Sequence, residues 1–539
     1  MPPYASRSAR RAVVGALLAL STSACAGGVA TAGGSPPAGP PAPRAASASA
    51  EAATERAFDA VRGDSARLYA FLKAMPKGGD LHSHLSGAIY AESFVAWAME
   101  DGLCVTAASL TLAPPPCDTV AGQRPVAEAL RVPGMHDRLV DAFSVRNFHA
   151  AIENGRDRFF ATFARFGAAS SRRTGDMLAE VASRAAAAQV RYLELMHTAG
   201  GGRVAALGSA VGWDDDFARL RQRVLDAGLA DTLTVIARLT DADEARRDAA
   251  LGCGTSAAAP GCQVTQRYLY QVARASDPER VFAQILAGFE LTRRDPRVVG
   301  FNLVQAEDDP IAMRDYSLHM RMIAYLRELY PDVPVALHAG ELAPGLVPPE
   351  GLRFHVREAV GVAGARRIGH GVDILYEDDP DAVLRLMARR RVLVEINLTS
   401  NDVILGVTGG RHPLRTYLAY GVPVALSTDD EGVARSEMTL EYRKAVEEQG
   451  VDYRTLKAMA RNSLEHAFVE GASLWADYER LTPVEACAPT AGGWDGASCR
   501  SFTGANTKAR LQASLERDYA AFEARVAAGA WPWSAGLGR

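Results

Sequence analysis

Two histidines, His82 and His84, lie one residue apart in the segment GGDLHSH at residues 78–84. Residues i and i+2 of a β-strand project to the same side, so both imidazoles are expected to face the same way. Two neutral imidazoles at that spacing can share one metal ion. The pair alone is a weak signal, and it gains weight only from polar groups elsewhere in the chain.

Further polar side chains follow other short apolar runs. His338 and Glu341 lie at and after the end of VPVALHAG, His370 lies in GHG, and Asp429 and Asp430 follow VPVALST. If each run is a parallel strand, these side chains meet at the carboxyl ends of the strands, which is the active-site face of a β/α barrel. Histidines that only fill a core would be scattered along their strands.

These residue types predict a metal-dependent hydrolase. Three imidazoles and a carboxylate suit zinc and leave a position for water, and the expected ligands are His82, His84, His338 and Asp429. Bound zinc lowers the pKa of that water and makes hydroxide available near neutral pH.

Three other polar residues are candidates for work on the substrate. We expect His370 to receive the proton of the water and to orient the hydroxide. A buried carboxylic acid such as Glu341 can deliver a proton near neutral pH. Asp430 is expected to accept a hydrogen bond from the substrate.

The scarcity of lysine limits the number of metal ions. The chain has five lysines, and none lies between Lys77 and Lys444. A carboxylated lysine from a middle strand, which bridges two metals in related barrels, is therefore not available. We expect one Zn²⁺ per chain.

The strand pattern predicts an α/β fold, specifically a (β/α)8 TIM-type barrel with additional inserted helices. Helical patterns such as 313–330 and 381–390 separate the apolar runs. A helical insertion is expected at about residues 90–185. The eight expected strands are 78–84, 190–197, 232–239, 297–304, 333–340, 366–372, 392–399 and 422–428.

The N-terminus has the features of an export signal. Arginines precede a short apolar run and then small residues, which predicts a signal peptide at residues 1–25. Cys25 resembles a lipoprotein attachment site, and plain cleavage near Ala24 or Ala26 is the alternative. Residues 26–51 are rich in Ala, Gly, Pro and Ser and are expected to form a disordered tether, followed by one catalytic domain at 52–530. The expected location is periplasmic or extracellular, with membrane contact only through Cys25.

Cysteine usage and charge agree with export and with a small-molecule partner. Besides Cys25, six cysteines fall into three close pairs, expected as the disulfides 104–117, 253–262 and 487–499. The net charge of −4 provides no basic field for nucleic acid. Apolar residues make up 48% of the chain, which is enough for a large core.

The motifs, taken together, resemble a known family. MPKGGDLHSHLSGAI, LHAGE, RIGHGVDI, VEINLTSN and LSTDDEGV resemble, in order, the motif set of the adenosine deaminase family within the metal-dependent amidohydrolase superfamily. FSVRNFH and the exported, cysteine-bearing context resemble its secreted, adenosine deaminase-related growth factor branch. The resemblance runs from about Met75 to about Phe468.

The resemblance implies a role for each motif residue. His82, His84, His338 and Asp429 would be the zinc ligands. Glu341 would protonate purine N1, His370 would handle the attacking water, and Asp430 would bind purine N7. Glu395 and Ser400 match supporting positions, and Glu395 would hold His370 in its working tautomer. The implied reaction is hydroxide attack at C6 of an adenine nucleoside with loss of ammonia.

Two departures from the family pattern affect the expected substrate. Ser86 stands where many members have an Asp that touches the ribose 5′ end. Gln305 stands where members usually have a Gly whose N–H meets purine N3. We therefore expect an adenosine-like nucleoside, with unmodified adenosine not necessarily preferred. The alternatives are hydrolysis of another C–N bond and a non-catalytic nucleoside-binding surface protein.

Overall fold

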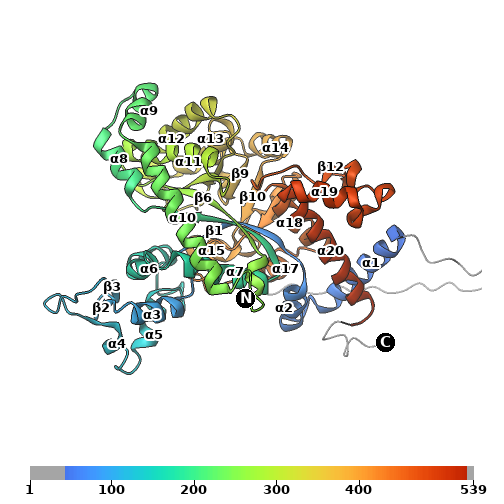
Figure 1. The fold of residues 1–539 in the computed structure, drawn as a ribbon, viewed down its shortest axis with the longest axis horizontal. Coiled ribbons are helices and arrows are strands. Elements are labelled where there is room, and N and C mark those ends of the chain that lie inside the picture. Colours follow the sequence, from blue (N-terminus) through green and yellow to red (C-terminus); the bar gives the residue numbers. More distant parts are fainter. Residues whose placement is uncertain (1–42, 531–539) are drawn as a thin grey trace, which may run out of the picture. The chain divides into compact units, whose positions relative to one another are not determined.

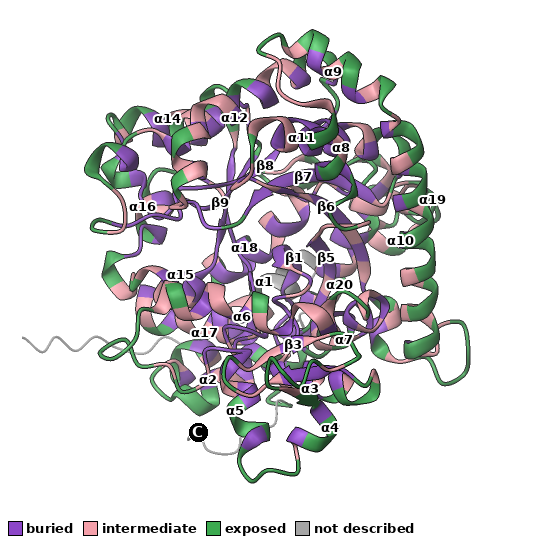
Figure 2. Ribbon diagram, turned by 90° about the vertical axis from the view of Figure 1, so that its left-hand side faces the viewer, coloured by how far each residue is buried: buried purple, intermediate pink, exposed green. Residues whose placement is uncertain are grey.

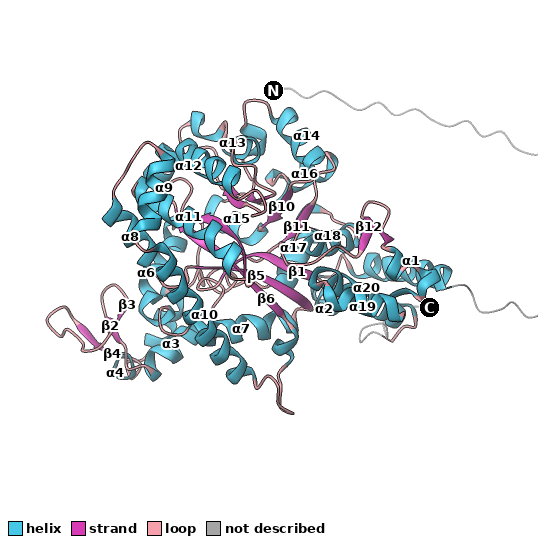
Figure 3. Cartoon of the chain, turned by 45° about the horizontal axis from the view of Figure 1, so that its top comes forward, coloured by secondary structure: helices cyan, strands magenta, loops and turns pink. Residues whose placement is uncertain are grey.

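Parallel strands lie at the centre of the described chain, and helices surround them (Figures 1 and 3). The computed structural model describes residues 43–530. Residues 1–42, with the expected signal peptide, Cys25 and most of the expected tether, lie outside the described residues. The described residues from Ser47 onward belong to one compact unit. None of their helices combines the length and the apolar character needed to cross a membrane.

Two four-stranded parallel sheets form the centre, with the strand orders β1-β5-β6-β7 and β8-β9-β10-β11. Every residue of β7 is buried, as expected for a parallel strand with both faces covered. Figure 2 shows the same burial along the central strands. The strands are β1 (Gly78–His84), β5 (Val190–His197), β6 (Thr265–Ala273), β7 (Val298–Val304), β8 (Ala336–Ala339), β9 (Arg367–His370), β10 (Leu393–Ile396) and β11 (Val424–Leu426).

The predicted α/β class with parallel strands is confirmed, whereas the eight parallel strands of the described residues lie in two sheets and form no continuous eight-stranded ladder. At one junction, the N–H of His84 donates to Asp429 O (2.9 Å) and the N–H of Asp429 donates to His82 O (2.8 Å). At the other junction, Asn302 Oδ1 of β7 accepts the N–H of His338 on β8 (2.8 Å). Closure into a full barrel stays a prediction.

Seven of the eight predicted strands are confirmed, and the one expected at 232–239 is wrong. That segment lies inside helix α10 (Leu229–Leu251), whose buried residues Leu229, Leu233 and Ile236 recur at helical spacing. Its β-branched residues favour a strand locally, but tertiary burial of one helical face overrides that preference. The missing strand is β6, where alternating Gln, Tyr, Tyr and Val in QRYLYQV are a strand signal.

The helices cover the strands, and some of them begin with a side-chain cap. Asp309 precedes α12 and accepts the N–H of Ile311 (2.8 Å), and Pro310 occupies the first helical position. The α-helices are α1 (Pro43–Val61), α2 (Ser65–Ala74), α3 (Ala91–Glu100), α4 (Val126–Ala129), α5 (Met135–Ala142), α6 (Gly155–Ser170), α7 (Thr174–Ala187), α8 (Arg203–Val211), α9 (Phe217–Asp226), α10 (Leu229–Leu251), α11 (Pro278–Arg294), α12 (Pro310–Leu329), α13 (His355–Gly361), α14 (Pro380–Arg390), α15 (Leu398–Leu405), α16 (Leu414–Ala419), α17 (Met438–Gln449), α18 (Tyr453–Glu465), α19 (Ala497–Ala505) and α20 (Thr507–Ala527).

Two segments depart from the expected boundaries. Residues 43–51, expected as the end of the tether, belong to the Ala-rich helix α1, and alanine is the strongest helix former. The insertion at about 90–185 contains α3 to α7, as expected, and also a small antiparallel sheet of order β3-β2-β4. Its strands are β2 (Cys104–Thr106), β3 (Thr111–Ala113) and β4 (Gln123–Pro125).

The three predicted disulfides are confirmed. Cys104–Cys117 joins β2 to the loop between β3 and β4, and Cys253–Cys262 joins the end of α10 to the segment before β6. Cys487–Cys499 ties the loop after β12 (Trp475–Asp477) and β13 (Thr482–Pro483) to α19. Each bridge closes a short local loop and limits the freedom of the unfolded chain.

Lys77 is a buried cation just before β1, with no exposed surface. Its Nζ donates to the carbonyl oxygens of Leu72 (2.5 Å), Met75 (3.0 Å) and Ala188 (2.9 Å), so all three N–H groups of the ammonium have acceptors. Burial nevertheless lowers the pKa of Lys77 to about 7 from its ordinary 10.5, because it disfavours the charged form.

Replacing Lys77 by Met should change how stability depends on pH. Between the folded pKa of about 7 and the unfolded value of 10.5, the unfolded wild-type chain binds more protons than the folded one. The wild type should therefore gain stability relative to K77M as pH rises, by up to about 1.4 kcal/mol per unit. Urea unfolding of both proteins at several pH values measures this difference. Parallel pH profiles for the two proteins would contradict the expectation.

Candidate active site

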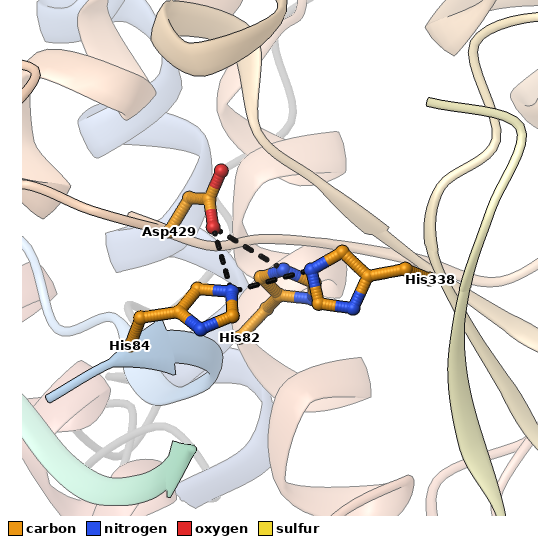
Figure 4. A group of neighbouring side chains, drawn as sticks. All are labelled: His82, His84, His338 and Asp429. Carbon is orange, nitrogen blue, oxygen red and sulfur yellow. Dashed lines mark hydrogen bonds and ion pairs between the residues drawn. The ribbon is translucent and has the colours of Figure 1, made fainter. Parts of the chain in front are cut away.

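Four of the predicted residues meet at the carboxyl ends of their strands (Figure 4). His82 and His84 come from β1, His338 from β8, and Asp429 from the turn that follows β11. One nitrogen or oxygen of each lies within 4.8 Å of the others, so the group could hold a metal ion. Residues separated by more than 300 positions in the chain are thus brought to one point.

His82 is oriented by Glu395 of β10. Its Nδ1 donates to Glu395 Oε2 (2.7 Å), and its Nε2 is therefore the atom available to a metal ion. Nε2 is buried without a hydrogen-bond partner among the described residues and lies 3.4 Å from Asp429 Oδ1. The expectation that Glu395 holds His370 is wrong, because its two oxygens contact His82 and Arg367 instead.

His338 and His84 also present nitrogen lone pairs to this point. His338 Nδ1 donates to Asn302 Oδ1 (2.9 Å), and its Nε2 lies 3.2 Å from His84 Nε2. Burial lowers the pKa of His84 to about 4 and that of His338 well below its usual value, so both are neutral at pH 7. Three imidazole nitrogens, among them the unpaired Nε2 of His82, and one carboxylate therefore fit a bound Zn²⁺ ion.

His370 is held by a chain of polar groups that begins at His412. The N–H of Leu414 donates to His412 Nδ1 (3.2 Å), so neutral His412 carries its proton on Nε2, which donates to Asn401 Oδ1 (3.1 Å). Asn401 Nδ2 then donates to His370 Nδ1 (2.9 Å). Neutral His370 therefore carries its proton on Nε2, which lies 4.0 Å from Asp429 Oδ2. With its proton on Nε2, His370 can orient a water molecule by donating a hydrogen bond to it. The same nitrogen cannot also accept the proton of that water, although the sequence had led us to expect this.

Glu341 is the buried acid beside this histidine. Its Oε1 lies 3.7 Å from His370 Nδ1, and its side chain is 7% exposed. Burial, followed by the negative charge of Asp429, raises the pKa of Glu341 well above its usual value. The carboxyl therefore holds a proton near neutral pH and can donate it.

Asp430 is buried beside Gly87 and is also a neutral acid. Burial, then the adjacent Asp429 charge, raises its pKa well above the usual range, and its Oδ1 has no partner among the described residues. A Cβ at position 87 would lie only 1.5 Å from that oxygen, so only glycine permits this approach. Asp430 can thus donate a hydrogen bond, whereas the sequence analysis expected it to accept one.

Three residues at this face adopt left-handed backbone conformations that are unusual for residues with a Cβ. Gln305, His370 and Asp429 have φ values of 78°, 70° and 58°. Such strain concentrates at functional sites. The positive φ at Gln305 explains why glycine suits this position. The Gln305 side chain turns to the neighbouring loop, where Oε1 accepts the N–H of Ala275 (2.9 Å).

A pocket of about 450 Å³ opens beside the four-residue cluster. His84, His338, Glu341, Asp429 and Asp430 line it, together with Ser86 and Gln305. Its remaining wall is mostly apolar, including three phenylalanines of α6 and Ile404 of α15, but it also carries polar side chains: Arg156, Gln271 and Asp309. Ser400 does not line the pocket; it is buried, and its hydroxyl has no partner in the described part of the chain.

Several residues that orient the predicted ones were not among the candidates from the sequence. Asn302 holds His338, Asn401 holds His370, and Gln271 Nε2 lies 3.3 Å from His84 Nδ1. A usable signal was present for Asn302, because it interrupts the otherwise apolar strand β7 near its carboxyl end. Gln271 was missed together with its strand β6.

The family model for adenosine deaminase matches residues 234–474. This segment contains His338, Glu341, His370, Asp429 and Asp430, while His82 and His84 join them only in space. An adenine deaminase from Rhizobium leguminosarum bv. trifolii is 30% identical over 282 residues, which are 50% of this chain and 80% of that protein. The chain belongs to the adenosine deaminase family.

Other members of the adenosine deaminase family match shorter segments. Adenosine deaminases from Shewanella loihica and Aliivibrio fischeri are 34% and 35% identical over 145 and 139 residues, which are 27% and 26% of this chain. The chain thereby spans only 40% and 38% of the length of these two relatives.

The solved structure of an adenine deaminase from Arthrobacter aurescens has a TM-score of 0.47 at 18% identity, covering 82% of this chain and 98% of that chain.

Substituting Glu395 by Gln should weaken zinc binding about 10–100-fold, because a neutral amide holds the His82 Nδ1–H less firmly. Competition with a chromophoric chelator measures the affinity. Glu441→Gln is the matched control, since this buried carboxylate accepts from Ser436 Oγ (2.7 Å) and Thr399 N (3.1 Å), away from the cluster. Equal zinc affinity in E395Q and the wild type would argue against the assigned role of Glu395.

Proposed function

We propose that this chain is a zinc-dependent hydrolytic deaminase of adenosine-like purine nucleosides, converting adenosine and water to inosine and ammonia. The observation that carries the proposal is the meeting of the four candidate ligands with two buried neutral acids, Glu341 and Asp430, around one pocket. Membership of the adenosine deaminase family supports the same reaction class.

One Zn²⁺ per chain is proposed at His82, His84, His338 and Asp429. A zinc ion held there would supply the Lewis acidity that brings the ionisation of a water toward neutral pH. The buried, unpaired Nε2 of His82 and the neutral imidazoles of His84 and His338 support this assignment. The absence of lysine between Lys77 and Lys444 supports a single ion.

Glu341 supplies the proton in the proposed reaction. Its neutral carboxyl donates to N1 of the purine, which withdraws electron density from C6 as oxygen adds to that carbon. The C6–N6 bond then breaks, and the amino group leaves as ammonia with one of the two protons that the water gives up, while the other proton restores the Glu341 carboxyl. General acid catalysis of this kind contributes about 10²–10⁴-fold to the rate.

His370 and Asp430 position the reactants. His370 Nε2–H orients the attacking water, with its tautomer set by Asn401. Purine N7 carries a lone pair and no proton, so it needs a donor, and the neutral carboxyl of Asp430 can provide one. The purine is thereby held at both N1 and N7.

The free base adenine is the second candidate substrate. One relative, of which the chain covers 80%, is an adenine deaminase. The pocket volume of about 450 Å³ lies within the roughly 300–1,000 Å³ typical of ligand pockets, so a nucleoside can fit as well as the free base. Comparing rates on adenine and adenosine separates the two. A clear preference for adenine would reject the nucleoside assignment.

Replacing Glu341 by Gln should lower kcat on adenosine about 10²–10⁴-fold, with zinc content unchanged. The loss of purine absorbance and the release of ammonia both report the rate. Glu441→Gln, a buried carboxylate away from the pocket, should keep kcat within about twofold. Wild-type kcat in E341Q would remove the proposed general acid.

We propose that Ser86 lets the pocket accept nucleosides with a modified or larger group at the ribose 5′ end. The variant Ser86→Asp tests this. Serine is short and neutral, and Phe160 and Phe163 add an apolar wall to the same pocket. An Asp at position 86 should lower kcat/KM for nucleosides with bulky apolar 5′ groups by about tenfold or more relative to adenosine, because it places a charge against them. A strong preference of the wild type for unmodified adenosine over 5′-modified nucleosides would refute the proposal that this site accepts larger 5′ groups.

Export is also part of the proposal. The three disulfides are usual for an oxidising compartment, and the charged, apolar and small residues of 1–25 have the order of a secretory signal. A periplasmic or extracellular location, lipidation at Cys25 and membership of the growth factor-related branch remain predictions. Mass analysis of the mature chain would distinguish lipidation from plain cleavage.

A further inference from the structure

Glu307 is a fully buried carboxylate in the segment that follows β7, with 1% of its surface exposed. Its Oε1 accepts the N–H of Gly340 (3.0 Å), and its Oε2 accepts the N–H of Glu341 (2.8 Å). His355 Nδ1 lies 2.6 Å from Oε1. One side chain therefore holds two consecutive backbone amides of the loop that carries Glu341.

Glu341 depends on its backbone for its position. In the described part of the chain its carboxyl makes no direct hydrogen bond, and its Oε1 lies 3.7 Å from His370 Nδ1. The carbonyl of Gly340 accepts the N–H groups of Val372 (2.7 Å) and Asp373 (3.1 Å). The Gly340–Glu341 peptide is thus held on its N–H side by Glu307 and on its carbonyl side by the loop after β9.

Gly340 leaves little room for this peptide to move. Its φ is +75°, which residues with a Cβ rarely adopt. An added Cβ would lie 2.4 Å from Asp373 Oδ1 and 2.9 Å from a methyl carbon of Val356. Packing therefore restricts the backbone at Gly340 to one arrangement. The carboxylate of Glu307 accepts the two N–H groups that this arrangement presents.

Glu307 is itself held as an anion. Burial opposes its ionisation, but the His355 hydrogen bond and the nearby Arg274 outweigh burial and lower the pKa of Glu307 to about 2. Arg274 Nη1 lies 4.0 Å from Oε2, and the His355 ring stacks on Tyr316 at 3.7 Å between centroids. As an anion, Glu307 offers both oxygens as acceptors, and charged acceptors form stronger hydrogen bonds than neutral ones.

We propose that Glu307 is a positioning residue that fixes the Gly340–Glu341 peptide and so sets where the Glu341 carboxyl stands in the pocket. This inference rests on the proposed function, in which Glu341 donates the proton. Glu307 touches no reacting atom, and its effect passes through two backbone N–H groups. A shift of about 1 Å at a catalytic group can cost about 10²-fold in rate.

The test combines kinetics with amide exchange in the full chain loaded with zinc. Glu307→Gln keeps the shape but turns an NH₂ group toward one of the two backbone N–H groups. It should lower kcat on adenosine by about 10²-fold, with KM within about threefold and zinc content unchanged. In the E341Q background the same change should have almost no effect, because the group it positions is already missing.

Glu377→Gln is the matched control. Glu377 is another buried carboxylate, 4% exposed, that accepts a backbone N–H, from Arg357 (3.0 Å), and it does not contact Glu341. It should lower the melting temperature as E307Q does and leave kcat within about twofold. An equal loss of kcat in E307Q and E377Q would overturn the proposal. So would a loss of rate from E307Q that is the same in the wild-type and in the E341Q background.

Hydrogen exchange separates this inference from the proposed function. The amides of Gly340 and Glu341 should exchange faster in E307Q than in the wild type, and E377Q should leave them protected. If the wild type deaminates no purine while this difference persists, the proposed function fails and the positioning by Glu307 stands. Unchanged protection in E307Q rejects the positioning.

A second pair of variants keeps the test decisive if E307Q does not fold. His355→Phe removes the donor to Glu307, whereas His355→Asn places an N–H near the former Nδ1. The Phe variant should lose kcat by about tenfold or more, and the Asn variant should recover most of it. Wild-type kcat in both variants would contradict the proposal.

Discussion

The hydrogen bond between Glu395 and His82 Nδ1 is the interaction on which the candidate site depends. It fixes the proton of His82 on one nitrogen and leaves Nε2 free to face Asp429. Glu395 can stay ionised in this dry interior because Arg367 lies 2.6 Å from its other oxygen and also pairs with Glu194. Buried ions are tolerated only when compensated in this way, so the metal site rests on a charge network that spans β5, β9 and β10.

The parallel arrangement of the strands explains why the other groups arrive at the same place. Each sheet presents its carboxyl ends on one side, and the backbone bonds between His84 and Asp429 join the two sheets beside the cluster. His370 and Asp429 adopt left-handed conformations at or just after the ends of β9 and β11, and Asp429 lines the pocket. Neighbouring hydrogen bonds, such as Asn401 to His370, hold these strained residues in place.

Much of this arrangement could be predicted from residue types and local spacing. The apolar runs at seven strands were strong enough to identify, and the polar residues after them marked the active-site face. The pairing of cysteines close in sequence was also correct, because short loops favour local bridges. The strand at 265–273 was missed because polar residues on both of its faces weaken the apolar/polar alternation. The segment 232–239 was predicted as a strand because of its β-branched residues, but its buried residues recur at helical spacing.

The sequence by itself determined which chemical groups are present and which end of each strand carries them, since these follow from residue identity and from the two-residue period of a strand. Only the tertiary structure decided which partner each group has. Glu395 reaches His82 and not His370, Asp430 is a donor and not an acceptor, and Glu307 holds the loop of Glu341. These outcomes depend on distances between segments far apart in the chain and on the exclusion of water around them, and neither is encoded in local spacing.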